Sequence, residues 1–162
     1  MQYVDSTFYA ANYGTAPAAF NRLLFEASRI VDNYTTGVDG VAKLKIAFPT
    51  DEDAQNAVRH CVCKLIKLID DIENAEKAVS GYQQRADGTY VSGVVSSISS
   101  GSESISFVNG NQINSALASA VADVKARNLM YRDIIIEWLS GVQDKNGVNL
   151  LFMGRYPHVH SN

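Results

Sequence analysis

The sequence predicts a mainly α-helical protein: a bundle of four to five helices with a long Gly/Ser-rich loop between the long helix and the C-terminal helix. Apolar residues recur at spacings of three and four in the front half and the back third of the chain, as on one face of a helix. Glycine, serine and turn dipeptides replace this pattern over residues 80–112, which we expect to carry short β-strands. The 162 residues have the size of one domain, so we expect a single domain over 1–162.

Composition and charge exclude several other classes of protein. The apolar fraction of 46% is typical of a globular chain and argues against wholesale disorder. No window approaches the roughly 18 apolar residues of a membrane-spanning helix, so we expect no membrane partner. The net charge of −3 is not the basic excess of a dedicated DNA-binding protein. Two cysteines are too few for a secreted disulfide framework, which favours a reducing compartment.

Capping residues delimit the first two predicted helices. A short helix is expected over 5–13, with Asp5 or Ser6 as its N-cap. A second helix is expected to begin at Thr15, whose hydroxyl can bond free backbone N–H groups, with Pro17 in the first turn. The apolar stripe of this second helix comprises Phe20, Leu23, Leu24, Ala27, Ile30, Val31 and Tyr34.

The strongest helix signal lies over residues 51–77, after a segment at 43–48 that we expect to be extended. Thr50 and Asp53 resemble a capping box at its start. One apolar row comprises Ala54, Val58, Cys61, Leu65, Leu68 and Ile72, and a second comprises Val62, Ile66 and Ile69. Because so wide an apolar face needs neighbours on more than one side, we expect the second row to pack against the core or against a neighbouring subunit.

Residues 80–112 form a polar insertion that a plain helix bundle does not need. Eight of the fifteen residues from 92 to 106 are serine. Short strands are expected at 89–91 and 104–108, next to the turn dipeptides Asp87-Gly88 and Asn109-Gly110. Loops of this length inside compact domains are generally functional or disordered.

The helical period returns from Ser115 and continues to Leu139. Its apolar positions are Leu117, Val121, Val124, Tyr131, Ile135 and Trp138. Asn128 interrupts the stripe, which leaves open one long helix or two helices bent near 127–128. The tail, residues 141–162, is turn-rich with one apolar cluster at 150–153, so it either docks on its own domain or awaits a partner.

His60, Cys61 and Cys63 invite a metal-site hypothesis, which their spacing does not support. Zinc needs about four ligands that converge tetrahedrally. Cys61 and Cys63 lie two positions apart on a helix, about 200° around its axis, so their thiols diverge. His158 and His160 are expected to be solvated, and we therefore expect neither a metal nor a cofactor.

An enzymatic function is not favoured by the sequence. Asp70, Asp71 and Glu73 are clustered acids that could do acid–base chemistry, but a solvated helix face explains them better. No Gly-x-Ser-x-Gly elbow, phosphate-binding loop or dinucleotide fingerprint is present. We expect no enzyme; a small hydrolase built on the clustered acids is a third alternative.

Three features point to an interaction protein instead: the wide apolar helix, the Gly/Ser-rich loop and the apolar cluster in the tail. Apolar surface that one chain leaves uncovered marks interaction sites. A symmetric homo-oligomer with heterologous contacts would use all three features. A cytosolic helical-bundle protein-binding module, acting as a monomer or dimer, is the alternative.

Five short motifs follow one another along the chain: Tyr13-Gly14-Thr15, Phe20-Asn21-Arg22-Leu23-Leu24, Ala27-Ser28, the run Ile30 to Thr35, and Ser102-Glu103-Ser104-Ile105-Ser106. In these motifs the chain resembles the small helical head–tail connector (adaptor) proteins of long-tailed bacteriophages. The order of the elements is similar over nearly the whole chain, with the Ser/Gly-rich loop at 80–101 and the tail after Gly147 least alike.

The resemblance implies a structural virion protein at the head–tail interface, present in the host cytoplasm before assembly. Such connectors form a ring, typically dodecameric, beneath the portal protein, extend the DNA channel and dock stopper or tail-completion proteins. DNA passes through the lumen without being read, and a mildly acidic chain would let it slide. The expected interface residues are Val62, Ile66, Ile69, Tyr90, Val91, Ser102, Glu103, Ile105, Phe107, Leu150, Leu151, Phe152, Arg155 and Tyr156.

Overall fold

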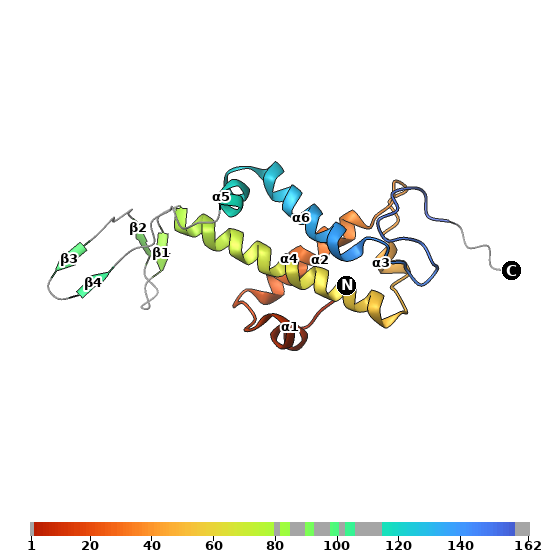
Figure 1. The fold of residues 1–162 in the computed structure, drawn as a ribbon, viewed down its shortest axis with the longest axis horizontal. Helices are drawn as coiled ribbons and strands as arrows, with labels where there is room; N and C mark the ends of the chain where they lie inside the picture. The colour runs from red at the N-terminus through yellow and green to blue at the C-terminus, as the bar shows by residue number, and fades with distance from the viewer. Residues whose placement is uncertain are drawn as a thin grey trace. The chain divides into compact units, whose positions relative to one another are not determined.

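The computed structural model describes residues 2–79, 82–84, 90–92, 98–100, 103–105 and 115–157, which contain six helices. The helices are α1 (Ser6–Tyr13), α2 (Phe20–Tyr34), α3 (Lys43–Ile46), α4 (Glu52–Val79), α5 (Ser115–Ala122) and α6 (Val124–Leu139) (Figure 1). The mainly α-helical class predicted from the sequence is confirmed, but the described residues contain six helices where four to five were expected, because residues 43–46 are also helical. None of the helices among these residues is both long enough and apolar enough to cross a membrane.

Four three-residue segments lie between α4 and α5. β1 (Tyr82–Gln84) pairs antiparallel with β2 (Tyr90–Ser92), and β3 (Ile98–Ser100) pairs antiparallel with β4 (Glu103–Ile105). The residues that would join these segments lie outside the described part of the chain. A strand-bearing loop as an element of the fold therefore stays a prediction, and the fold class rests on the helices.

The chain divides into two compact units. The first comprises Met1–Asp70 and Asn128–Asn162, and the second comprises Asp71–Arg127. The N-terminal helices, the first part of α4 and most of α6 belong to the first unit. The expectation of a single domain stays a prediction.

The start of α1 follows the sequence prediction, whereas the start of α2 does not. The carboxylate of Asp5 accepts a hydrogen bond from the Phe8 N–H at 2.7 Å and so caps α1. The α2 helix begins at Phe20 rather than at Thr15, because the Phe20 N–H bonds the Pro17 carbonyl at 3.0 Å in a turn that precedes the helix. This turn brings Phe20 edge-on to the ring of Tyr9, with the ring centroids 5.5 Å apart.

The expected extended segment at 43–48 is wrong, since residues 43–46 form one helical turn. The Ala47 N–H donates to the Lys43 carbonyl at 2.8 Å. The helical turn buries the adjacent side chains of Lys43 and Leu44 together. An extended chain would direct them to opposite faces and could not bury both on one side, whereas the helical turn does.

The long helix α4 forms as predicted, but a different residue caps it. The Asp51 carboxylate accepts from the Ala54 N–H at 2.9 Å, in place of the expected capping box of Thr50 and Asp53. Both apolar rows of α4 are buried, apart from the half-buried Ala54 at the start of the first row. The buried core cluster of the first unit comprises Tyr3, Val4, Tyr9, Phe20, Leu23, Leu24, Ala27, Val31, Leu44, Val58, Cys61, Val62, Cys63, Leu65, Ile66, Ile69, Ile135, Leu139 and Leu150.

The second unit contains the end of α4, α5 and the first turn of α6. Arg127 donates to the Glu76 carboxylate at 2.5 Å and, through Nε, to the Ala120 carbonyl at 3.1 Å. The sequence left open one long helix or two helices. The structure shows two, α5 and α6, and the break between them is at Asp123 rather than at 127–128. The Asp123 carboxylate accepts from the Lys125 N–H at 2.8 Å and so caps the second helix of the pair.

We expect Ile66→Ala to lower the free energy of unfolding by about 2–5 kcal/mol, because it leaves a cavity at a fully buried position. Asn74→Ala, an exposed position on the same helix, is the matched control and should change the free energy by about 0.5 kcal/mol or less. Denaturant unfolding monitored by circular dichroism measures both. A small effect of Ile66→Ala would contradict the assignment of this row to the chain's own core.

Candidate protein interface

The C-terminal segment, residues 140–157, docks on the loop of residues 35–48 within the first unit. The α6 helix ends at Leu139, and Gly141 turns the chain with a φ of +80°. Gln143 and Asn149 then form an antiparallel bridge, and the side chain of Leu150 is fully buried in the core. The sequence left open whether this tail docks on its own domain or awaits a partner, and the described part of it is docked.

Backbone hydrogen bonds hold the segment on the loop at several points. The Val38 N–H donates to the Met153 carbonyl at 3.0 Å, and the Lys145 N–H donates to the Ala47 carbonyl at 3.3 Å. The two backbones come so close that a Cβ atom at Gly37 would lie 2.7 Å from the Gly154 carbonyl oxygen. Any side chain at Gly37 would therefore push the C-terminal segment away.

A buried lysine joins the loop to the segment from inside. Lys43 is fully buried, and its ammonium donates to the Thr35 carbonyl at 2.9 Å and to the Leu150 carbonyl at 3.2 Å. Burial lowers the pKa of Lys43, and the charges of Asp39 and Asp144 oppose this shift. No sequence pattern predicted this role, because a lysine beside apolar residues is usually exposed.

Asp144 organises the hairpin at the start of the segment. Its Oδ1 accepts from the N–H groups of Asn146 at 2.8 Å and Val148 at 2.9 Å. Its Oδ2 accepts from the Tyr156 hydroxyl at 2.5 Å, and Asn146 Nδ2 donates to the same hydroxyl at 2.8 Å. Burial and the bond to Asp144 raise the pKa of Tyr156. The end of the segment is thus tied back to its beginning.

Asp39 holds the end of the segment from the loop side. Its carboxylate accepts from the Tyr156 N–H at 2.7 Å and from the Val41 N–H at 3.2 Å. These backbone donors, the Tyr156 bond first, lower the pKa of Asp39. Asp39 therefore bridges the loop and the far end of the segment.

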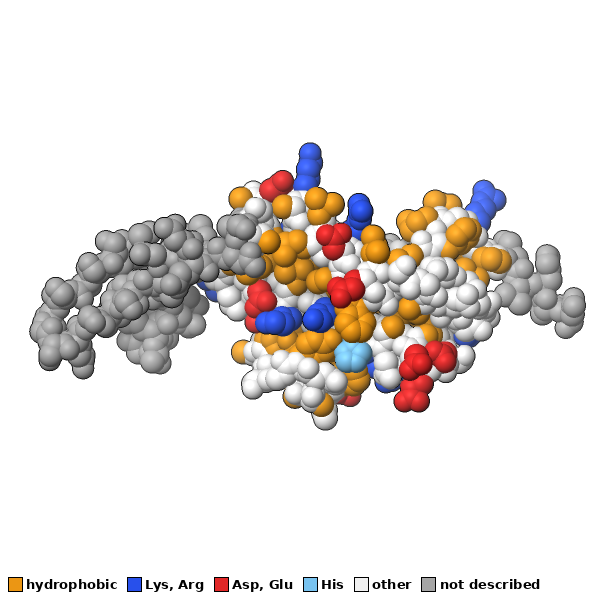
Figure 2. Space-filling view, viewed as in Figure 1, with side chains coloured by type: hydrophobic (Ala, Val, Ile, Leu, Met, Phe, Trp, Pro, Cys, Tyr) orange, Lys and Arg blue, Asp and Glu red, His pale blue; other side chains and the backbone are white. Residues whose placement is uncertain are grey.

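Docking leaves an apolar patch at the surface, which we define as Val38, Phe152 and Met153. Their exposed fractions are 75%, 47% and 53%. The hydrogen bond between the backbones of Val38 and Met153 makes these residues neighbours. Hydrophobic side chains reach the surface in several groups on the face drawn in Figure 2. The patch is displayed on backbone that is already docked, so a partner would meet it preformed.

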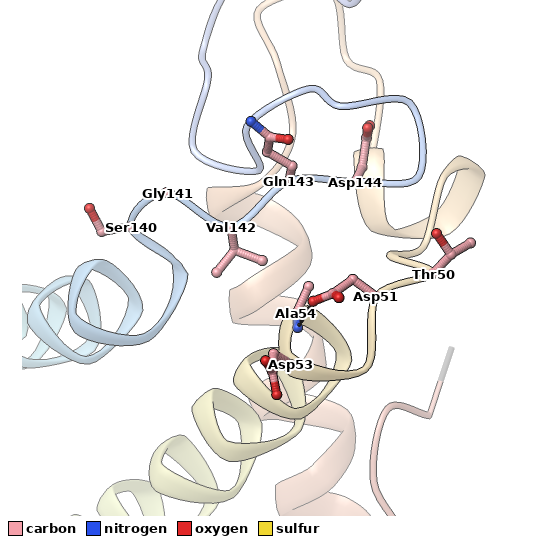
Figure 3. A pocket seen from close by; sticks show the side chains of 9 residues that line it. All are labelled: Thr50, Asp51, Asp53, Ala54, Ser140, Gly141, Val142, Gln143 and Asp144. Carbon is pink, nitrogen blue, oxygen red and sulfur yellow. Dashed lines mark hydrogen bonds between the residues drawn. The ribbon is translucent and has the colours of Figure 1, made fainter.

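An open cleft of about 510 Å³ lies beside the segment, between residues 140–144 and the start of α4 (Figure 3). Asp51, Asp53 and Asp144 line it, but Figure 3 shows the Asp144 side chain pointing away from the other two. The carboxylates of Asp51 and Asp144 are also engaged by backbone N–H groups. The cleft therefore does not bring its acids together for paired acid–base chemistry.

His60, Cys61 and Cys63 lie in or beside the core, whereas His158 and His160 lie outside the described residues. His60 Nδ1 lies 2.9 Å from the Tyr13 hydroxyl, and its ring stacks on Trp138 with the centroids 5.2 Å apart. The thiols of Cys61 and Cys63 are buried, and burial raises the pKa of each to about 12. Among the residues that the structure describes, no three His, Cys, Asp or Glu side chains are grouped to hold a metal.

The expected interface residues fall into three groups. Val62, Ile66 and Ile69 are buried in the core of the first unit. Of the two alternatives for this row, a neighbouring subunit or the chain's own core, the structure shows the core. These side chains therefore offer no free surface to a partner. The residues Tyr90, Val91, Glu103 and Ile105 lie in β2 and β4, and their side chains are not described; Ser102 and Phe107 lie outside the described residues.

The third group lies in the C-terminal segment, where the structure separates anchors from exposed residues. Leu150 is buried and Leu151 is half-buried against the core. Phe152 and Arg155 are exposed, while Tyr156 is half-buried and hydrogen-bonded. Sequence reasoning missed Val38, since a single valine in a polar loop carries no periodic signal.

Comparisons of the chain with protein-family models, with curated proteins and with solved structures found no match. The head–tail connector resemblance therefore stays a hypothesis. The geometry of the first unit independently defines a docked C-terminal segment that carries an exposed apolar patch.

We expect Lys43→Met to remove a pH dependence from the stability of the protein. The pKa of Lys43 is lowered in the folded state, so between that pKa and the ordinary value of 10.5 the unfolded chain binds more protons. The contribution of Lys43 to stability therefore rises with pH through this window. Urea unfolding at a series of alkaline pH values measures it.

The difference in unfolding free energy between wild type and Lys43→Met should shift in favour of the wild type as the pH rises through that window. Taking the difference cancels the tyrosines that titrate in both proteins. Lys145→Met removes an exposed lysine and is the control. A difference that does not change with pH would show that Lys43 is not buried as a charged group.

We expect Asp39→Ala to loosen the end of the C-terminal segment without unfolding the first unit. The substitution removes the acceptor of the Tyr156 and Val41 N–H groups, while the buried Leu150 stays in the core. Hydrogen exchange should become several-fold faster at the Tyr156 amide and stay unchanged in the middle of α4. Equal exchange at Tyr156 in both proteins would contradict the bridging role of Asp39.

Proposed function

We propose that this chain is a structural, non-enzymatic protein of a tailed phage or prophage particle, a head–tail connector that oligomerises as a ring beneath the portal. The observation that carries the proposal is the exposed apolar patch of Val38, Phe152 and Met153, held on docked backbone. An apolar surface that is rigid before binding loses little entropy when a partner covers it. The connector role itself is inferred from the order of the helices and from the motifs that carry the resemblance.

In this role the ring extends the DNA channel and docks the stopper or tail-completion protein. The ring is dodecameric by resemblance, and DNA passes through its lumen non-specifically. The net charge of −3 agrees with a channel that does not grip the duplex. The protein works in the neck of the virion and resides in the host cytoplasm before assembly.

Two regions make the contacts in this proposal. The apolar patch and the exposed Arg155 meet the portal or the next neck protein. The loop from Tyr90 to Phe107 contacts an adjacent subunit or extends into the channel, through Tyr90, Val91, Ser102, Glu103, Ile105 and Phe107. Because Leu150 and Tyr156 already anchor the segment, assembly adds the contacts of Phe152 and Met153 and does not require the whole tail to fold.

The placement of Leu150 decides how the tail is best tested. A truncation after Asn149 would remove a fully buried leucine and destabilise the core together with the patch. The paired substitution Phe152→Ser and Met153→Ser instead removes apolar surface at two exposed positions. Phe25→Ser is the matched control, since Phe25 is 68% exposed on α2, outside the C-terminal segment.

We expect the Phe152→Ser and Met153→Ser variant to fold but to be depleted at least tenfold from phage particles made by a strain that encodes the protein. Phe25→Ser should be incorporated like the wild type. Quantitative mass spectrometry of purified particles, relative to the major capsid protein, measures all three. Absence of the wild-type chain from infectious particles would contradict the connector function and favour the cytosolic protein-binding module. Normal incorporation of the double variant would contradict the role of the patch alone.

A further inference from the structure

The tip of the hairpin in the C-terminal segment carries an Asn–Gly pair, Asn146-Gly147. Asn146 is exposed, and Gly147 has a φ of +78°. A Cβ at Gly147 would have only Gln143 Oε1 nearby, at 4.0 Å. Since Gly147 has no side chain and the space around it is open, little shields its backbone nitrogen from the side-chain amide of Asn146.

We propose that Asn146 is a deamidation site whose reaction is controlled by docking of the C-terminal segment. The Gly147 backbone nitrogen, after losing its proton to solvent base, attacks Cγ of Asn146. The Cγ–Nδ2 bond breaks, and the amide nitrogen leaves as ammonia after taking up a proton. The resulting five-membered succinimide is opened by water at either carbonyl, which gives aspartate or isoaspartate at position 146. The net reaction consumes one water, releases one ammonia and involves no oxidation or reduction.

In the docked state both reacting groups are held by hydrogen bonds. Asn146 Nδ2 donates to the Tyr156 hydroxyl at 2.8 Å, and the Gly147 N–H donates to the Asp144 carbonyl at 3.0 Å. Tyr156 is itself fixed by Asp144 through its hydroxyl and by Asp39 through its backbone. Release of Tyr156 therefore frees the side chain that has to turn toward Gly147, so undocking accelerates the reaction.

The product changes the contacts that hold the segment. A carboxylate at position 146 cannot donate to the Tyr156 hydroxyl as the amide does. The Tyr156 hydroxyl has a single proton, which already goes to Asp144, and a second carboxylate would compete for it. Two carboxylates around one hydroxyl also repel each other. Deamidation is therefore a one-way step that weakens docking of the segment that displays Phe152 and Met153, and it does not depend on the connector function.

The rate can be followed in the purified full-length protein incubated at mildly alkaline pH. Mass spectrometry of the tryptic peptide 146–155 reports conversion of Asn146, and Asn149 in the same peptide is an internal control. Asn149 precedes the buried Leu150, whose N–H donates to the Val142 carbonyl at 2.9 Å, so Asn149 should stay intact. In guanidinium the second Asn–Gly pair, Asn109-Gly110, supplies a reference for the unfolded rate.

We expect Tyr156→Phe to accelerate conversion of Asn146 several-fold in the native protein and to leave the rate in guanidinium unchanged. Arg155→Lys, which changes a neighbouring exposed position and keeps the tryptic site, should behave like the wild type in both conditions. A native Asn146 that stays unmodified in both the wild type and Tyr156→Phe, while the unfolded chain reacts, would overturn the site. Equal native rates in the wild type and Tyr156→Phe would overturn control by docking.

The consequence for docking is tested separately with Asn146→Asp, which mimics the product, and Asn146→Ser, which removes the amide without adding charge. Hydrogen exchange at the Tyr156 amide should be faster in Asn146→Asp than in Asn146→Ser, and faster in both than in the wild type. The same order should hold for the Val38 amide, which bonds the Met153 carbonyl. Exchange in Asn146→Asp equal to that in the wild type would overturn the effect of the product on the segment.

Discussion

The first unit depends on how the ammonium of Lys43 is accommodated in its interior. A buried ammonium without partners is strongly unfavourable, so it has to find hydrogen-bond acceptors close by. The carbonyl of Thr35 at the end of α2 and the carbonyl of Leu150 in the C-terminal segment supply them. These acceptors come from parts of the chain far apart in sequence. The cation therefore fixes where the C-terminal segment lies, and a displaced segment would leave it short of acceptors.

The surface that we assign to partner binding follows from this anchoring. With Leu150 held inside by Lys43, the next residues continue outward, and the close approach of Gly37 and Gly154 keeps them against the loop. Phe152 and Met153 then remain exposed next to Val38. The same contacts that expose the patch also restrain Asn146 through Tyr156. One docked conformation thus has two consequences: it exposes the patch, and it slows the deamidation that we propose for Asn146.

The residues of α4 show which sequence inferences succeed and which do not. Its length and its two apolar rows were predictable, because side chains three and four positions apart must share a helix face. What covers the second row was not predictable, since a core and a neighbouring subunit provide the same apolar environment. Val62, Ile66 and Ile69 turned out to be covered by the chain itself. For Phe152 and Met153 the chain's own core is not an alternative, because both side chains are exposed in the folded first unit.

The sequence by itself determined the helical class, the short first helix with an N-cap at Asp5 or Ser6, and the extent of the long helix, because periodicity and capping are local properties. It also located an apolar cluster in the tail. Only the tertiary structure decided that this cluster divides into a buried Leu150 and an exposed Phe152, that residues 43–46 are helical, and that Asp39, Lys43 and Asp144 hold the C-terminal segment. The contacts of Asp144, Lys43 and Asp39 with the C-terminal segment join groups 12 to 117 positions apart in sequence. No local sequence pattern predicts such pairs, because their contacts form only when distant parts of the chain come together on folding.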